Sequence, residues 1–282
     1  MAEFTENTST FKSIDGINIF YRHYPAEEER AILLIAHGLG EHSGRYKNVV
    51  RHLVPKGISI WAIDHRGHGK SEGKRGHVNT FPQYISDLRG LYEIAKSNKP
   101  DNRKIFLLGH SLGGLIALYM SLKFPELLNG VIVSSPVLGV TVKIPVIKEM
   151  VGNTLSDIWP DLTLSNEIDY TKISRDVNVQ RAYKNDPLVH DQVSTRWFTE
   201  CMKTMDMTNK LAQELSLPIL MQVAGDDYLV DAKSSKAFFE RLICKDKTLY
   251  VYDELYHEIY NELPHNRAIV LSDLEHWLEA RI

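Results

Sequence analysis

One short segment of the chain, Gly109-His110-Ser111-Leu112-Gly113, has the residue types and spacing expected around a serine nucleophile. An apolar run precedes it and a helical pattern follows it, which is the strand, turn and helix context that a G-x-S-x-G motif requires. A turn that projects a serine needs residues without side chains two positions before and two positions after it. Five residues alone also fit a serine that only caps a helix. The flanking elements favour a nucleophile at Ser111.

A reactive serine needs two partners, because its hydroxyl is a weak nucleophile at neutral pH. A general base must take its proton, and a third group must fix the tautomer of that base. After one apolar run the chain reads Gly225-Asp226-Asp227, and after the next it reads Tyr256-His257-Glu258. A carboxylate and then a histidine therefore follow the serine in the order that this mechanism requires. We expect His257 to be the base and one of the two aspartates to be the acid.

Most of the 12 histidines need another explanation. His65 and His68 are spaced like a pair of metal ligands, but the glycines around them favour a turn and no third ligand is evident. His190 lies in a polar stretch, where a solvated side chain is expected. His110 reads as a packed residue at the end of a strand. The sequence therefore predicts no metal site.

Hydrolysis of an ester also needs donors for the oxyanion that develops in the transition state, and backbone N–H groups usually supply them. The loop after residues 31–36 reads His37-Gly38-Leu39-Gly40-Glu41-His42. Gly38 permits close approach of the backbone, so the N–H of Leu39 can pair with that of Leu112, the residue after the serine. A glycine-rich phosphate loop is the alternative, but its Lys-Ser/Thr ending is missing. This loop is the candidate oxyanion loop.

The elements that must position these residues alternate between strand and helix patterns. Continuous apolar runs predict strands buried on both faces, at residues 31–36, 58–63, 104–108, 130–134, 217–224 and 248–252. Amphipathic stretches predict helices at residues 46–53, 81–96, 112–123 and 267–280. An antiparallel hairpin with strands at residues 11–14 and 17–24 and Asp15-Gly16 as its turn opens the chain. The alternation predicts an α/β fold with a mostly parallel, doubly wound sheet.

The alternation fails over residues 137–215, where prolines interrupt short apolar clusters. A stretch this long without a core strand reads as an insertion that covers the carboxyl edge of the sheet as a cap, or lid. Residues 1–136 and 216–282 then form the core domain. Ile144, Ile147 and Val151 lie in the most apolar part of the insertion, and we expect them to bind substrate. The same apolar face could instead dock transiently on a membrane or only pack the cap onto the core.

The composition sets wider limits on the class of protein. The 282 residues include 43% apolar ones, which is enough for a large core and excludes a disordered or fibrous chain. With 33 Lys and Arg against 36 Asp and Glu there is no basic surface for nucleic acid. Two cysteines make no disulfide framework. The N-terminal segment resembles no signal peptide, and no apolar run is long enough to span a membrane, so a cytoplasmic protein is expected.

Longer motifs carry a resemblance to a known family. They are HGLGEHSGRY at residues 37–46, DHRGHGKSEG at 64–73, GHSLGG at 109–114, NDPL at 185–188 and YHEIYNEL at 256–263. Together they resemble the monoacylglycerol lipase and lysophospholipase branch of the α/β-hydrolase superfamily, over about residues 11–277. The resemblance implies the α/β-hydrolase fold, with Ser111 as nucleophile, Asp227 as acid, His257 as base and the backbone N–H groups of Leu39 and Leu112 as the oxyanion hole.

Two points qualify how the acid is assigned. The family's glycine before the acid is replaced by Ala224, which leaves Asp226 and Asp227 to be compared. Val230 lies three residues after Asp227 and fits the family's D-x-x-V pattern, so the resemblance favours Asp227. Asp226 is expected to be an exposed turn carboxylate.

The activity that the resemblance implies is a serine esterase without metal or cofactor, which cleaves the single acyl chain of a monoacylglycerol to free fatty acid and glycerol through an acyl-enzyme. A lysophospholipase or a general carboxylesterase is the enzymatic alternative. A ligand-binding member of the fold without catalysis is a third hypothesis. Such proteins typically lose the serine or the histidine, whereas this sequence keeps both.

Overall fold

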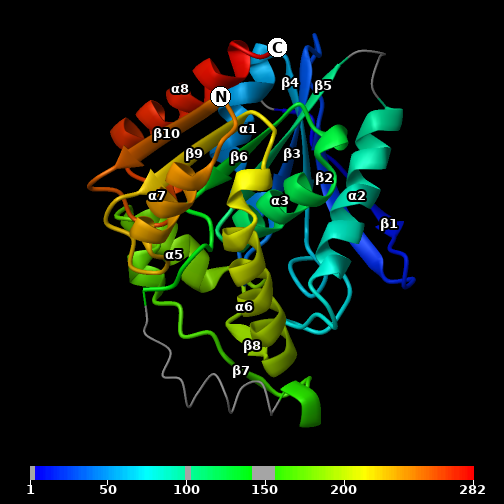
Figure 1. Ribbon diagram of the computed structural model, residues 1–282. Helices are drawn as coiled ribbons and strands as arrows, with labels where there is room; N and C mark the ends of the chain where they lie inside the picture. Colours follow the sequence, from blue (N-terminus) through cyan, green and yellow to red (C-terminus); the bar gives the residue numbers. More distant parts are fainter. Residues whose placement is uncertain (1–3, 99–102, 142–155) are drawn as a thin grey trace.

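A mostly parallel sheet of eight strands forms the centre of the molecule in the computed structural model, which describes residues 4–98, 103–141 and 156–282 (Figure 1). The strands lie in the order β1-β2-β4-β3-β5-β6-β9-β10. Their bounds are Asn7–Lys12 (β1), Asn18–Tyr24 (β2), Ala31–Ala36 (β3), Ile58–Ile63 (β4), Lys104–His110 (β5), Gly130–Ser134 (β6), Ile219–Ala224 (β9) and Lys247–Tyr252 (β10). Within this sheet, as far as the structure describes it, only the pairs β1–β2 and β2–β4 are antiparallel.

The predicted strands are confirmed, and three of them, β3, β4 and β6, have the predicted bounds. Every residue of β3 and β4 is buried, as expected for strands with helices on both faces. The opening hairpin also forms, with Gly16 in the left-handed region at φ 85°. Its first strand begins earlier than the apolar residues suggest, because Asn7 and its neighbours pair with β2 at the exposed edge of the sheet.

Helices cover both faces of the sheet, so alternate residues of one strand enter different cores. Those of β3 divide into Ile32, Leu34 and Ala36 on one face and Ala31, Leu33 and Ile35 on the other. The first core contains residues of α2 (Pro82–Ser97), α3 (Leu112–Lys123) and α7 (Ala232–Arg241). The second contains residues of α1 (Lys47–Leu53) and α8 (Pro264–Glu279). A hydrophobic core on each face therefore holds the sheet in place, so the loops at its carboxyl edge start from fixed positions.

The segment between β6 and β9 adds no strand to the central sheet in the part that the structure describes. Its own elements are β7 (Thr163–Ser165), α5 (Val177–Asn185), β8 (Gln192–Ser194) and α6 (Thr195–Lys210). β7 and β8 pair with each other, and α6 packs against α3. Figure 1 shows these elements grouped at one end of the molecule. We call residues 137–215 the inserted segment.

The inserted segment bonds to two loops of the core. The backbone N–H of His190 donates to Gly40 O at 2.9 Å, in the loop after β3. The N–H of Glu258 donates to Ile173 O at 2.7 Å, in the loop after β10. Both loops carry predicted site residues, so the inserted segment is tied directly to the site.

Within the described residues, no helix is both long enough and apolar enough to cross a lipid bilayer.

Candidate active site

Ser111 stands between β5 and α3 in a conformation that L-residues rarely adopt, with φ 53° and ψ −117°. Hydrogen bonds hold this strained turn: its N–H donates to Ser134 O at 3.0 Å, and its carbonyl accepts from Gly114 and Leu115 at 2.9 and 3.2 Å. The side chain makes no capping hydrogen bond to the helix. The capping alternative is therefore wrong, and the hydroxyl is left for other chemistry.

The two glycines of the motif are required by close packing as well as by the turn. A Cβ atom on Gly109 would lie 2.1 Å from the carbonyl oxygen of Gly113, and a Cβ on Gly113 would lie 2.0 Å from that of Ala36. Strand and helix meet here backbone to backbone. The spacing thus sets how closely α3 approaches the sheet, and so where Ser111 points.

His257 and Asp227 form a buried pair at the carboxyl ends of β10 and β9. The Nδ1 atom of His257 lies 2.7 Å from Oδ2 of Asp227. The other carboxylate oxygen, Oδ1, accepts from the N–H groups of Leu229 and Val230 at 2.8 and 3.0 Å. Asp226 is exposed and makes no contact with His257 among the interactions of the described residues. Of the two candidate acids, only Asp227 contacts the histidine.

Asp227 and His257 shift each other's pKa values. Burial alone raises the pKa of the Asp227 carboxyl, but the charge and hydrogen bond of His257, with the two backbone N–H groups, hold that pKa below its usual range. Burial lowers the pKa of His257, yet the Asp227 carboxylate outweighs it and holds the pKa above its ordinary value. With Nδ1 held by Asp227, Nε2 is the ring atom left to accept a proton.

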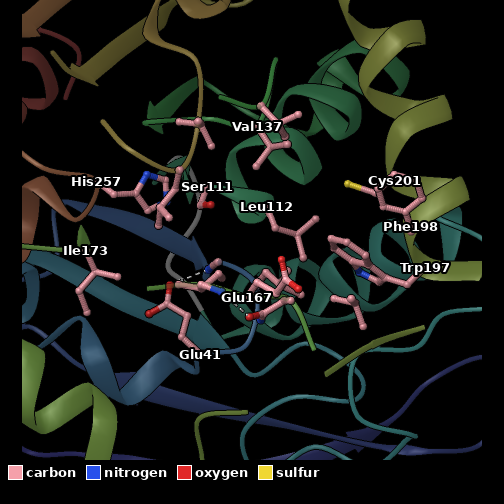
Figure 2. Close-up of a pocket in the computed structure, with 18 of the residues that line it drawn as sticks. Glu41, Ser111, Leu112, Val137, Glu167, Ile173, Trp197, Phe198, Cys201 and His257 are labelled. Carbon is pink, nitrogen blue, oxygen red and sulfur yellow. Dashed lines mark hydrogen bonds between the residues drawn. The ribbon is translucent and has the colours of Figure 1, made fainter. Parts of the chain in front are cut away.

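Ser111 and His257 line one cavity of about 720 Å³ and lie beside each other at its wall in Figure 2. The lining also includes Gly38, Leu39 and Leu112 near the serine, Trp197, Phe198, Cys201 and Met202 on α6, and, from other segments, Ile173, Tyr183 and Tyr228. Most of this wall is apolar. Ser111 therefore lies at the wall of a mostly apolar cavity that is lined by residues of both the core and the inserted segment.

The loop after β3 lies against the serine. A Cβ on Gly38 would be 3.2 Å from Cβ of Ser111, so only a glycine fits this approach without displacement. The backbone N–H groups of Leu39 and Leu112 have no acceptor among the described residues. Both residues line the cavity, as the predicted oxyanion hole requires.

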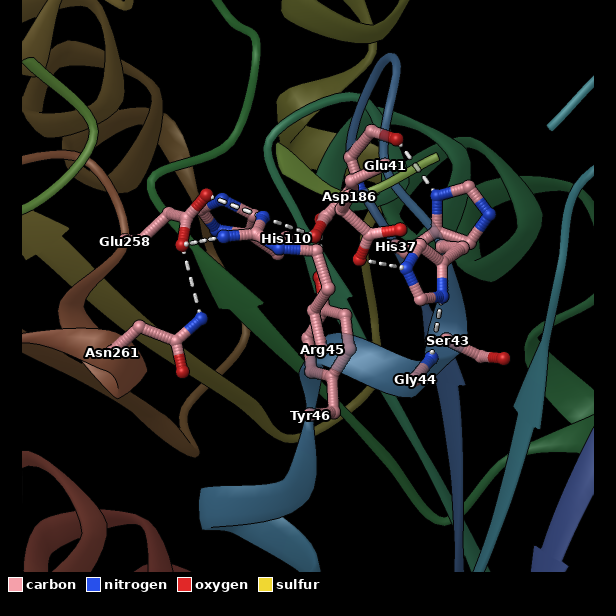
Figure 3. Close-up of polar contacts among 12 residues, drawn as sticks. His37, Glu41, Ser43, Gly44, Arg45, Tyr46, His110, Asp186, Glu258 and Asn261 are labelled. Carbon is pink, nitrogen blue, oxygen red and sulfur yellow. Dashed lines mark hydrogen bonds and ion pairs between the residues drawn. The ribbon is translucent and has the colours of Figure 1, made fainter. Parts of the chain in front are cut away.

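A buried charged network, which the sequence reasoning missed, lies beside the cavity (Figure 3). Arg45 donates to both carboxylate oxygens of Glu258 at 2.6 and 2.7 Å and to Glu41 at 2.9 Å. Burial raises the pKa of Glu41, but the Arg45 charge and neighbouring histidines lower it to about 2. The network joins the loop after β3 to the residue next to His257. The sequence signal for this network is the pair of opposite charges Glu41 and Arg45, which lie four residues apart in a loop that contains glycine.

Tertiary contacts correct one expectation for the other histidines. His190 is not solvated: it is half-buried, its Nε2 lies 3.1 Å from Gly67 O, and its ring packs 4.8 Å from that of His68. His110 is buried at the end of β5, as expected, and its ring lies 4.7 Å from that of His257. The described residues contain no cluster of His, Cys, Asp or Glu that could hold a metal.

The sequence profile of the family described as "Serine aminopeptidase, S33" matches residues 27–264. The chain belongs to this family of serine hydrolases. This match, together with the relatives that follow, confirms the predicted α/β-hydrolase fold and the predicted kinship with monoacylglycerol lipases.

Individual relatives agree with this assignment. The chain is 30% identical to a monoacylglycerol lipase of Mycolicibacterium smegmatis, and the match covers 100% of both chains. It is 32% identical to a monoacylglycerol lipase of Paleococcus ferrophilus whose crystal structure superposes with a TM-score of 0.86, covering 94% of this chain and 99% of the other. It is 35% identical to an uncharacterized abhydrolase domain-containing protein of Dictyostelium discoideum, matching 99% of this chain but spanning only 29% of that protein.

Proposed function

We propose that this serine hydrolase cleaves the acyl ester of monoacylglycerols to free fatty acid and glycerol. The observation that carries the proposal is the cavity at Ser111 and His257, whose wall is mostly apolar but also includes polar residues such as Ser165, Asn166 and Glu167. An acyl chain suits the apolar wall, and the polar groups among the lining residues can form hydrogen bonds with the hydroxyl groups of glycerol. Two monoacylglycerol lipases among the relatives support the same substrate class.

The proposed mechanism follows from the contacts. His257 takes the hydroxyl proton of Ser111 on Nε2 while the serine oxygen attacks the ester carbonyl carbon. The N–H groups of Leu39 and Leu112 bind the resulting oxyanion. Collapse of the tetrahedral intermediate expels glycerol, which receives the proton from His257 and leaves an acyl-enzyme. Water then attacks the acyl carbon with His257 again as base, and the fatty acid departs. Asp227 stays ionised throughout and stabilises the protonated histidine.

The charged residues in the described lining of the cavity favour this substrate over a lysophospholipid. A lysophospholipase must accommodate an anionic phosphate, which arginine or lysine usually binds. The described residues that line the cavity include no lysine or arginine; of their glutamates, Glu41 and Glu258 share the Arg45 charge, and Glu167 has no such partner among the ion pairs of the described residues. An uncharged glycerol group suits this lining better than a phosphate does.

We further propose that the inserted segment acts as a cap that holds the acyl chain. Support comes from α6, which supplies Trp197, Phe198 and Met202 to the cavity wall. Ile144, Ile147 and Val151, the predicted substrate contacts, lie outside the described residues and remain predictions. The proposed division into a cap at residues 137–215 and a core at 1–136 and 216–282 rests on the same contacts.

The decisive experiment measures fatty acid release from a monoacylglycerol and from lysophosphatidylcholine of the same acyl chain, with p-nitrophenyl butyrate as a soluble reference ester. We expect the monoacylglycerol to have the higher kcat/KM of the two lipids, and Ser111→Ala to remove essentially all turnover of all three substrates. A preference for lysophosphatidylcholine would replace the proposed substrate. Retained turnover in Ser111→Ala would reject the proposed nucleophile.

Transient contact with a membrane is the last part of the proposal. The most exposed apolar side chains of the described part of the inserted segment are Ile158, Trp159 and Leu164, at 75%, 59% and 57%. An indole ring among aliphatic side chains suits the interface of a lipid bilayer. We expect the protein to cosediment with phosphatidylcholine vesicles and Trp159→Ser to weaken this binding. Ile269→Ser, which removes a 46% exposed apolar residue of α8, is the matched control. Equal binding by wild type and Trp159→Ser would contradict the proposed contact.

A further inference from the structure

His37 is a fully buried histidine that the mechanism above does not use, and both of its ring nitrogens are engaged. Its Nδ1 atom lies 2.7 Å from the carbonyl oxygen of Gly38. Its Nε2 atom lies 2.9 Å from the backbone N of His65. The rings of His65 and His68 pack against it with centroids 4.4 and 5.3 Å away. The imidazole thus bridges two loops at the carboxyl edge of the sheet.

The two contacts determine where the ring proton lies. A backbone N–H can only donate, so Nε2 must be the acceptor in the bond from His65. A carbonyl oxygen can only accept, so Nδ1 must carry the proton and donate to Gly38. Burial lowers the pKa of His37, which keeps the ring in this neutral form. The carbonyl of Gly38 is therefore held by a directed donor.

The held carbonyl belongs to the same peptide unit as the N–H of Leu39. In a planar trans peptide the C=O and N–H bonds point in opposite directions, and the structure contains no cis peptide bond among its described residues. When Gly38 O points to the His37 ring, the N–H of Leu39 must point away from that ring. Gly38 and Leu39, the two residues of this peptide unit, line the cavity together with Ser111, whereas His37 does not.

Glu41 restrains the preceding peptide, between His37 and Gly38, through its N–H group. Its Oε1 atom accepts from the N–H of Gly38 at 2.6 Å. The same carboxylate oxygen accepts from the hydroxyl of Tyr46 at 2.8 Å. Gly38 has no side chain to restrict its backbone, so without these bonds its two flanking peptides could rotate freely. Two buried side chains therefore replace the restraint that a glycine lacks.

We propose that His37 is a positioning residue that fixes the Gly38–Leu39 peptide and so aims the N–H of Leu39 at the oxyanion. This inference rests on the proposed oxyanion hole and adds the residue that keeps one of its donors in place before substrate arrives. A donor fixed in advance needs no reorganisation when charge develops on the ester oxygen, and this is the source of its effect on rate.

The test compares three replacements that separate the two bonds. His37→Phe keeps a ring and removes both bonds. His37→Asn places an amide donor near the Nδ1 position and loses the bond from His65. His37→Gln reaches the Nε2 position and leaves the Gly38 carbonyl without a donor. His23→Phe is the matched control, because that histidine stacks on Trp61 at 3.8 Å in the sheet and does not line the cavity.

Each variant is measured for kcat and KM on p-nitrophenyl butyrate, for inhibition by a trifluoromethyl ketone, whose serine adduct carries an oxyanion, and for melting temperature. We expect His37→Phe and His37→Gln to lose about 10²-fold in kcat, close to the loss of a whole oxyanion donor, with KM changed by less than about threefold. Affinity for the ketone should fall in parallel. His37→Asn should recover most of the rate, and His23→Phe should match wild type.

Two outcomes would overturn the proposal. One is a folded His37→Phe or His37→Gln protein with a kcat within about threefold of wild type. The other is a rate that follows the melting temperature across all variants, with no recovery in His37→Asn, since packing alone would explain it. Because the assay uses a soluble ester, a protein that hydrolyses this ester but no monoacylglycerol would refute the proposed substrate and leave the His37 test intact.

Discussion

At the scale of single residues, the reactivity of this site comes from neighbours rather than from residue type. Asp226 and Asp227 are adjacent carboxylates, yet only Asp227 is buried against His257 and bonded to two backbone N–H groups. The remaining free position on the histidine ring is consequently Nε2. A serine in a strained turn then lies in the same cavity.

The two aspartates should differ sharply when they are replaced. Asp227→Asn removes the charge that fixes the tautomer of His257, so we expect kcat to fall by about 10³ to 10⁴-fold. Asp226→Asn, the matched control on an exposed turn, should stay within about twofold of wild type. Steady-state kinetics on p-nitrophenyl butyrate measure both. Similar losses in the two variants, or the reverse order, would contradict the assignment of the acid.

The pH profile should report the raised pKa of His257. The base must be neutral, so kcat/KM falls as the pH drops through this pKa. An unperturbed histidine titrates near about 6.5, and the Asp227 carboxylate holds the pKa of His257 above its ordinary value. We therefore expect the acidic limb to have its midpoint above about 6.5. The residual activity of Asp227→Asn should show a midpoint at lower pH, because the stabilising charge is gone. A midpoint below 6.5 in wild type, or an upward shift in the variant, would contradict this account.

At the scale of elements, the position of the serine depends on how closely α3 approaches β3 and β5. Gly113 lies directly against the backbone of Ala36 and His37, with no space for a Cβ atom. The same short distance places the first N–H groups of α3 near the loop after β3. The geometry of the oxyanion hole therefore depends on how closely α3 packs against the sheet.

Replacing Gly113 with alanine tests this coupling. Alanine favours a helix over glycine by up to about 1 kcal/mol, but the new Cβ would meet backbone oxygens at 2.0 and 2.5 Å. Overpacking of this kind costs about 3 kcal/mol, so Gly113→Ala should lower both the melting temperature and kcat. Gly90→Ala in α2 is the comparison, because the nearest atom to its Cβ would be a ring carbon of Phe11 on the edge strand at 2.5 Å, a side chain away from the site, so it should lower the melting temperature without lowering kcat. Thermal unfolding and kinetics measure both variants. Equal melting temperatures of Gly113→Ala and wild type would show that α3 can move away from the sheet without loss of stability.

At the scale of the whole molecule, the cavity belongs to neither part of the chain alone. Loops at the carboxyl edge of the sheet supply Ser111 and His257, and α6 of the inserted segment supplies Trp197 and Phe198. Such a cavity can bury a long acyl chain next to the reacting ester. Burying one methylene group contributes about 0.8 kcal/mol.

The dependence on acyl length should therefore be steep and should depend on α6. We expect kcat/KM to rise by up to about fourfold per methylene until the cavity is filled. Phe198→Asp, which puts a charge in the wall, should penalise long-chain monoacylglycerols far more than p-nitrophenyl acetate. Ile269→Asp on α8, outside the cavity, is the control. A series of monoacylglycerols of increasing length measures the effect. Equal losses on long and short esters, with a lowered melting temperature, would show that Phe198 only supports the fold.

Much of the fold could be predicted because its signals are local. The bounds of β3, β4 and α3 match the predicted ones, since a continuous apolar run and a helical period are properties of neighbouring residues. The first strand was harder: its pairing with β2 is decided across the hairpin, and most of its residues are exposed. The half-buried state of His190 was missed for the same reason, because Gly67 and His68 lie more than a hundred residues away.

The sequence by itself determined the nucleophile motif, the order of its partners and the alternation of strands and helices, because each of these is set by spacing along the chain. Only the tertiary structure decided which aspartate meets His257, how Arg45 joins Glu41 to Glu258, and which nitrogen of His37 carries its proton. These depend on groups that the fold brings together from distant parts of the chain. Directed hydrogen bonds form only when such groups come within about 3 Å of each other, and no local pattern records that distance.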